Sequence, residues 1–250
     1  MILSGHQPAY LPWLGFIHKM AISDTFCVLD TVQYSSGDFI NRNRIKTARG
    51  PLWLSVPVYS HGKPRICDVR ISEINWHRKH LATIANAYVK APYYDCYISE
   101  FQEVLTKRYV FLTDLTGALL RVLVRLLEIG VRLVVASDYD FVGKKSDCII
   151  GMCTKLGATT CIFGSQGRNY ADLPAFASAG INVVFQEYGH PVYRQCYGAF
   201  MPRLSVIDLL FNEGPRSLEI LLSGNDRYAN TAKCPGESEW RISASVEKLR

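Results

Sequence analysis

The 250-residue sequence lacks several patterns that mark well-known functional classes. Its eight cysteines form no Cys-x-x-Cys pair, and most lie in apolar stretches such as TFCVLD. At this chain length the pattern favours buried free thiols in a reducing compartment over a disulfide framework, and it disfavours a zinc site. No run of Lys and Arg forms a basic arm, so the net charge of +6 suits an anionic small ligand better than nucleic acid.

Membrane signals are also missing from the sequence. The first residues show no basic stretch followed by an apolar stretch, so we expect no secretory signal and a cytoplasmic location. The longest apolar run, at 115–137, contains Arg121, Arg125, Glu128 and Arg132, so we expect no membrane insertion. With 48% hydrophobic and 20% charged residues, the composition is that of a folded globular protein.

The sequence does contain apolar strands that alternate with amphipathic helices. Strands are predicted at 1–4, 23–34, 50–60, 66–72, 132–137, 159–165 and 181–188. Helices are predicted from about Gly15 and at 75–92, 97–109, 112–130, 145–157, 170–180 and 205–224, the last broken near Gly214 and Pro215. This alternation indicates βαβ units, so we predict an α/β fold with a mostly parallel sheet and helices on both faces, Rossmann-like, with an all-helical segment in the middle.

The organisation along the chain follows from the same pattern. We predict a single α/β domain over residues 1–224, with a candidate helical subdomain at 75–130. Residues 225–250 have few apolar anchors and form a polar C-terminal tail. The sequence leaves open whether the protein is a homo-oligomer.

Four polar clusters occur where predicted strands end. They comprise residues 6–19, residues 30–46, residues 137–147, and residues 164–170 together with 187–195. Because the carboxyl ends of parallel strands lie along one edge of a sheet, we expect these clusters to converge in one crevice.

The first cluster, GHQPAYLPWLGFIHK at 5–19, cannot be regular structure at its start, because Pro8 and Pro12 each fix φ and remove a backbone donor. This stiff loop carries His6, which is the best acid–base candidate. A histidine held by a backbone carbonyl for structural reasons is an equally good interpretation. Tyr10 and Trp13 are candidates for stacking on a base or a sugar, although core packing is the commoner fate of such rings.

The segment NRNRIK at 41–46 alternates cations with asparagines. In an extended strand Arg42, Arg44 and Lys46 share one face, which suits a clamp for phosphate or carboxylate. A solvated hairpin turn is the alternative interpretation. The segment GSQGRNY at 164–170 is a second candidate anion site, through Gly164 and Arg168, although a tight turn between a strand and a helix has the same pattern.

Several motifs together resemble those of the WbqC-like protein family. They are HQPAYLPWLGFIHKM, FINRNRIK, WLSVPV, and HPVYRQ followed by F-x-P-x-LSVIDLLFN, in matching order between about residues 3 and 224. Genes of this family typically lie among bacterial O-antigen and other surface-polysaccharide genes. The resemblance therefore implies a cytoplasmic protein that acts on a nucleotide-linked sugar, and an acyl or aminoacyl donor as the second substrate. No other cofactor and no metal are expected.

The resulting hypothesis is a sugar-nucleotide-modifying transferase that moves an N-acyl or aminoacyl group to an amino sugar. Its predicted catalytic residues are His6, Gln7, Asp30 and Gln33, with His6 accepting the amine proton and Asp30 or Gln33 orienting it. The predicted substrate-binding residues are Tyr10, Trp13, Lys19, Asn41, Arg42, Asn43, Arg44, Lys46, Gly164, Arg168, His190 and Tyr193. Among these, Arg42, Arg44 and Arg168 would hold the pyrophosphate, whereas Tyr10 and Trp13 would line the sugar or base pocket.

Two alternatives stay open. The order of a strand, a histidine loop and a helix that begins near a glycine is similar to nucleotidyltransferases with a His-x-Gly-His motif. The second histidine of that motif is absent here, because proline-rich sequence follows His6 and His18 lies too far along. The other alternative is a non-catalytic protein that binds a nucleotide-linked sugar or acts as a scaffold in polysaccharide assembly.

Overall fold

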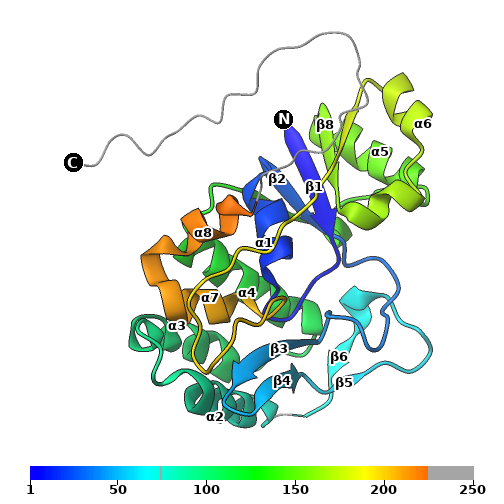
Figure 1. The fold of residues 1–250 in the computed structure, drawn as a ribbon. Coiled ribbons are helices and arrows are strands. Elements are labelled where there is room, and N and C mark those ends of the chain that lie inside the picture. The colour runs from blue at the N-terminus through cyan, green and yellow to red at the C-terminus, as the bar shows by residue number, and fades with distance from the viewer. Residues whose placement is uncertain (74, 225–250) are drawn as a thin grey trace.

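The central feature of the fold is a parallel sheet of five strands, in the order β7-β2-β1-β8-β9 (Figure 1). The computed structural model describes residues 1–73 and 75–224, so the tail predicted at 225–250 lies outside the described residues. The strands of the sheet are β1 (Ile2–His6), β2 (Thr25–Val28), β7 (Arg132–Val135), β8 (Thr160–Phe163) and β9 (Asn182–Phe185).

Helices cover both faces of this sheet. On one face Leu3 and Cys27 pack against Met152 and Phe176, which come from α5 (Ser146–Leu156) and α6 (Leu173–Ser178). On the other face Phe26 contacts Phe16 of α1 (Leu14–Ala21), with the two ring centroids 5.1 Å apart. Figure 1 shows α5 and α6 on the side opposite α1. A sheet that is covered on both faces needs continuously apolar strands, and all four residues of β2 and of β8 are buried. The predicted α/β fold is confirmed.

The predicted all-helical segment is also present. It consists of α2 (Trp76–Tyr88), α3 (Tyr94–Thr106) and α4 (Leu112–Leu126). The predicted C-terminal helix is broken as expected, into α7 (Val206–Glu213) and α8 (Ser217–Ser223). The break falls at Gly214, where φ is +54° and a β-carbon would lie 2.5 Å from the Tyr93 ring. Within the described ranges, no helix has both the length and the apolar character that crossing a membrane requires.

Two small antiparallel sheets stand apart from the main one. They pair β3 (Arg42–Thr47) with β4 (Gly50–Ser55), and β5 (Val58–Tyr59) with β6 (Arg70–Ile71). The strand predicted at 50–60 is interrupted after Ser55, where Val56 donates to the Asn41 carbonyl and Pro57 has no amide hydrogen to donate. The strand predicted at 66–72 instead begins with a 3₁₀ turn at Ile66–Asp68.

The strand order places a ligand-binding position at the centre of the sheet. β1 pairs with β2 on one side and with β8 on the other, and both pairings are parallel. The chain therefore leaves β1 in one direction and later adds β8 and β9 in the other direction. In open α/β sheets ligands bind at the carboxyl ends of the strands where the order reverses, which here means after His6 and after Phe163.

Candidate functional site

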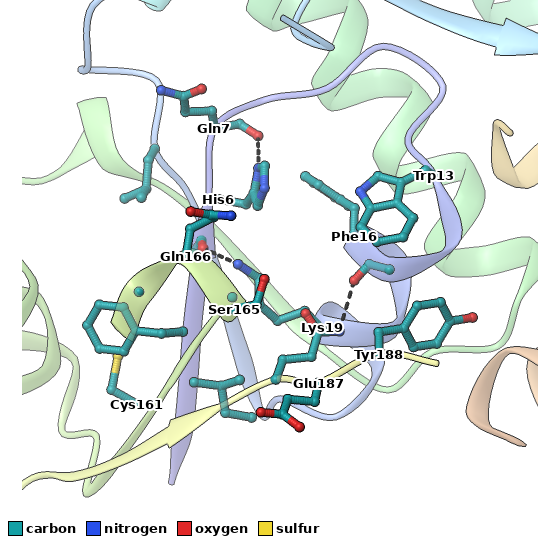
Figure 2. A pocket seen from close by; sticks show the side chains of 18 of the residues that line it. His6, Gln7, Trp13, Phe16, Lys19, Cys161, Ser165, Gln166, Glu187 and Tyr188 are labelled. Carbon is teal, nitrogen blue, oxygen red and sulfur yellow. Dashed lines mark hydrogen bonds between the residues drawn. The ribbon is translucent and has the colours of Figure 1, made fainter. Parts of the chain in front are cut away.

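A cavity of about 1010 Å³ opens at the carboxyl ends of β1, β8 and β9 (Figure 2). Its volume is at the upper end of the range for small-molecule sites. The polar and aromatic side chains that line it include His6, Gln7, Trp13, Lys19, Ser165, Gln166, Gln186, Glu187, Tyr188, His190 and Arg203.

His6 is the last residue of β1 and lies open to the cavity. Its Nδ1 lies 2.9 Å from the Gln7 carbonyl oxygen, which only accepts, so Nδ1 carries the proton and Nε2 keeps its lone pair. Desolvation by the cavity walls, together with the nearby Lys19 cation, lowers the pKa of His6. Contact with water in the cavity limits this desolvation without reversing it, so the imidazole is neutral at pH 7.

Lys19 supplies a buried positive charge beside His6. Only 4% of the residue is exposed, and its Nζ donates to the Gly5 carbonyl oxygen over 2.8 Å. In the part of the chain that the structure describes, no carboxylate forms an ion pair with it. Burial lowers the pKa of Lys19 to about 8, so the side chain is mostly cationic at pH 7. A buried cation that faces a cavity stabilises an anion bound there.

The start of α1 adds positive potential to the same wall. Trp13 precedes the helix, and the first turn has no acidic residue and no side-chain cap. Gly15 is required here, because a β-carbon at this position would lie 2.1 Å from the Trp13 ring. Glycine therefore allows the indole to lie across the beginning of the helix and to form part of the cavity wall (Figure 2).

One end of the cavity combines aromatic rings with unpaired polar atoms. The Trp13 and Tyr188 rings meet edge to face at 5.9 Å. The Tyr188 hydroxyl and His190 Nε2 are buried and have no hydrogen-bond partner among the described residues. His190 Nδ1 donates to the Pro191 carbonyl oxygen, so Nε2 is an acceptor. Buried polar atoms are normally hydrogen-bonded, and aromatic walls with free polar atoms suit a sugar ring and its hydroxyl groups.

Three of the predicted site residues lie outside this cavity, and the polar groups of two of them pair with other protein groups. Tyr10 is fully buried, and its hydroxyl lies 2.8 Å from Nδ1 of His80, which is also buried. Asp30 is 2% exposed and accepts from the Ser137 amide and hydroxyl at 2.9 and 2.7 Å. Gln33 is exposed beyond β2 and forms an isolated bridge with Arg65.

Further predicted residues take part in buried hydrogen bonds that hold the fold together. Asn43 donates to the Leu11 carbonyl oxygen over 2.6 Å, which fixes the loop after β1. Lys46 is 3% exposed and donates to the Ala199 carbonyl oxygen over 2.6 Å. The Tyr193 hydroxyl donates to Asp208 over 2.8 Å, and this carboxylate is fully buried.

The predicted anion-binding arginines do not line the cavity either. Arg42 and Arg44 lie on the β3–β4 hairpin, and Asn41 beside them donates to the Val56 carbonyl oxygen. Arg168 pairs with Glu187 at 2.6 Å and stacks on the Phe185 ring. Gly164 does line the cavity. The structure therefore brings His6, Gln7, Trp13, Lys19, Gly164 and His190 together, and it does not bring the arginines to them.

Some cavity residues are absent from the predicted set. Ser165, Gln166 and Tyr188 belong to strand-end clusters, so their position after β8 and β9 is the signal that points to them. Phe16 and Arg203 carry no such signal, because one lies within α1 and the other within an irregular segment. Over residues 1–73 and 75–224, no three His, Cys, Asp or Glu side chains are grouped to hold a metal ion.

Comparisons with known proteins agree with the motifs. The profile of the WbqC-like protein family matches residues 7–220. The chain belongs to this family. It is also 31% identical over 219 residues to "Uncharacterized protein Rv1507c" of Mycobacterium tuberculosis, covering 86% of this chain and 95% of that protein.

The motifs of this WbqC-like protein divide into two groups in the structure. The first motif, at 6–20, supplies the cavity with His6, Trp13 and Lys19. The later motif at 200–212 supplies Asp208, which accepts hydrogen bonds from Tyr88 and Tyr193 and is not among the residues that line the cavity. The same segment contains Arg203, which does line the cavity.

Proposed function

We propose that the protein transfers an N-acyl or aminoacyl group to the amine of a nucleotide-linked amino sugar that binds in the cavity. The observation that carries the proposal is the presence, in one cavity at the reversal of the sheet order, of the neutral His6 imidazole and of the buried Lys19 cation, which has no carboxylate partner among the described residues. A substrate that carries phosphate and loses a proton from its amine needs a cation to bind the phosphate and a base to accept the proton.

The binding step uses the positive wall of the cavity. The phosphate groups of the substrate would lie against Lys19 and the start of α1, where charge attraction operates in a partly desolvated space. The sugar would lie against the Trp13 and Tyr188 rings, beside His190.

The chemical step uses the lone pair of His6 Nε2. The amine nitrogen attacks the acyl carbonyl carbon, a C–N bond forms, and the bond between that carbon and the donor's carrier breaks. His6 takes the proton from the amine nitrogen and passes it to the departing carrier, so protons balance over the reaction. The bound phosphate offsets the Lys19 charge and removes one cause that lowers the pKa of His6, which strengthens the base when substrate is present.

The test begins with thermal-shift measurements on dTDP-, UDP- and GDP-linked amino sugars, with acetyl-coenzyme A as the donor probe and mass spectrometry of the products. His6→Asn should keep the ligand-induced rise in melting temperature and lose transfer by about 100-fold or more. Gln33→Ala is the matched control outside the cavity and should keep full activity. Full turnover by His6→Asn, or no thermal shift with any nucleotide-linked sugar, would contradict the proposal.

Nucleotidyl transfer is the second candidate, because the sheet order and a histidine at the end of β1 favour it. Release of pyrophosphate from a nucleoside triphosphate and a sugar phosphate would identify this reaction, whereas acyl transfer releases none. Binding with no turnover in either assay would favour a non-catalytic role in polysaccharide assembly.

A further inference from the structure

The outer face of the β3–β4 hairpin carries cations and aromatic rings that the cavity does not use. One face of the hairpin packs Asn43, Ile45 and Leu54 against the interior. Side chains alternate along a strand, so Arg42 and Arg44 project from the opposite face, where Trp53 lies directly across from Arg44. We call the four residues Phe39, Arg42, Arg44 and Trp53 the hairpin platform.

The two guanidinium groups of the hairpin platform are held in place without any acidic partner. The Arg42 and Arg44 guanidinium carbons lie 4.4 and 5.6 Å from the centroid of the Trp53 ring. Arg42 also donates to the Gly37 carbonyl oxygen, and Arg44 to the Arg203 carbonyl oxygen. Among the described residues, no carboxylate forms an ion pair with either side chain.

Several features of the hairpin platform are typical of a binding surface. Both Nε atoms are buried without a hydrogen-bond partner in the described part of the chain, which is unusual for a charged group. Trp53 and Phe39 are each 42% exposed and their ring centroids lie 5.6 Å apart. Two aromatic rings are thus partly exposed beside two cations that form no ion pair within residues 1–73 and 75–224.

We propose that the hairpin platform is a second anion-binding site, which takes the phosphate groups of a ligand other than the one in the cavity. The planar guanidinium groups of Arg42 and Arg44 can each donate two parallel hydrogen bonds to phosphate oxygens. Both lie over the Trp53 ring, which fixes their spacing. None of the four platform residues lines the cavity, although Arg44 donates to the carbonyl oxygen of Arg203, which does line it, so the hairpin platform adjoins the cavity wall. The proposal does not depend on which reaction the cavity performs.

The fluorescence of two tryptophans reports binding at the two sites separately. Trp13 lines the cavity, whereas Trp53 belongs to the hairpin platform. In the Trp13→Phe background, inorganic pyrophosphate should change the fluorescence saturably, and adding Trp53→Phe should remove that change. Calorimetry on the wild type measures binding without relying on either reporter.

Substitutions at the charged residues then show which of the two sites binds pyrophosphate. Arg42→Gln with Arg44→Gln should weaken pyrophosphate binding at the platform by about tenfold or more. Arg42→Lys with Arg44→Lys keeps the charge, loses the planar fork, and should give an intermediate loss. Lys19→Met should remove cavity binding alone and leave the Trp53 signal unchanged. Unchanged melting temperatures establish that the hairpin variants are folded.

Two results would overturn the proposal. One is pyrophosphate binding that Lys19→Met abolishes and the double arginine variants leave unchanged, because all binding would then belong to the cavity. The other is the absence of any Trp53 response to pyrophosphate at low ionic strength, where screening is weakest.

Discussion

Acidification should destabilise this protein through two buried histidines, His18 and His80. They are 0% and 5% exposed, and burial lowers the pKa of each to about 4 from an ordinary value of 6.5. The His18 Nδ1 accepts from the Gln186 amide at 2.8 Å, and the His80 Nδ1 accepts from the Tyr10 hydroxyl at 2.8 Å. Protonation of either ring places a charge in the interior, and at His18 it also breaks the hydrogen bond from the Gln186 amide.

The sign and the size follow from these pKa values. Between pH 6.5 and about 4 the unfolded chain binds a proton at each histidine that the folded chain excludes, so the free energy of unfolding falls as the pH falls. Each histidine contributes at most about 3 kcal/mol over the full shift. Together they account for a large part of a typical domain stability of about 5–15 kcal/mol.

Urea unfolding at a series of pH values between about 7 and 4.5 measures this effect. His18→Gln and His80→Gln should each reduce the change in unfolding free energy, because glutamine does not titrate, and the lowered pKa values of His6 and His190 contribute to the remainder. Asp208 acts in the opposite direction, since burial raises its pKa, so the comparison of variants is more decisive than the wild-type slope. An unchanged slope in both variants would refute the reasoning.

Three further outcomes are expected. Lys19→Met should weaken binding of nucleotide-linked sugars about tenfold or more by calorimetry, and wild-type binding should fall as the pH rises above about 8, where Lys19 loses its proton. Gly15→Ala should displace the Trp13 indole, which the fluorescence of that residue reports, and should lower ligand affinity. Tyr193→Phe removes a donor to Asp208 and should cost about 1–3 kcal/mol in unfolding free energy, with little effect on affinity.

The fold and part of the cavity were predictable because they depend on local patterns and on one topological rule. Apolar strands such as Thr160–Phe163, separated by amphipathic helices, indicate a parallel sheet from the chain alone. In a parallel sheet the residues after strand ends lie along one edge. His6 and His190, which follow β1 and β9, line one cavity as that rule predicts, whereas the predicted cluster at 137–147 does not line it.

The remaining site residues were not predictable, because a residue type does not reveal whether its partner is a ligand or the protein itself. Tyr193 and Asn43 have the polar groups that a substrate site needs. Their partners are Asp208 and the Leu11 carbonyl oxygen, groups that lie 15 and 32 positions away in the chain. Such pairings depend on the packing of loops against the core, which neither periodicity nor spacing encodes.

The central place of β1 in the sheet bears on how the chain is synthesised. Because the first strand pairs with β2 and also with Thr160–Phe163, one of its edges stays without a neighbour until two thirds of the protein has left the ribosome. Nascent or truncated chains that end before residue 160 would expose that edge, together with the apolar surface later covered by α5. Such fragments should aggregate or recruit chaperones, and the ligand cavity forms only late in translation.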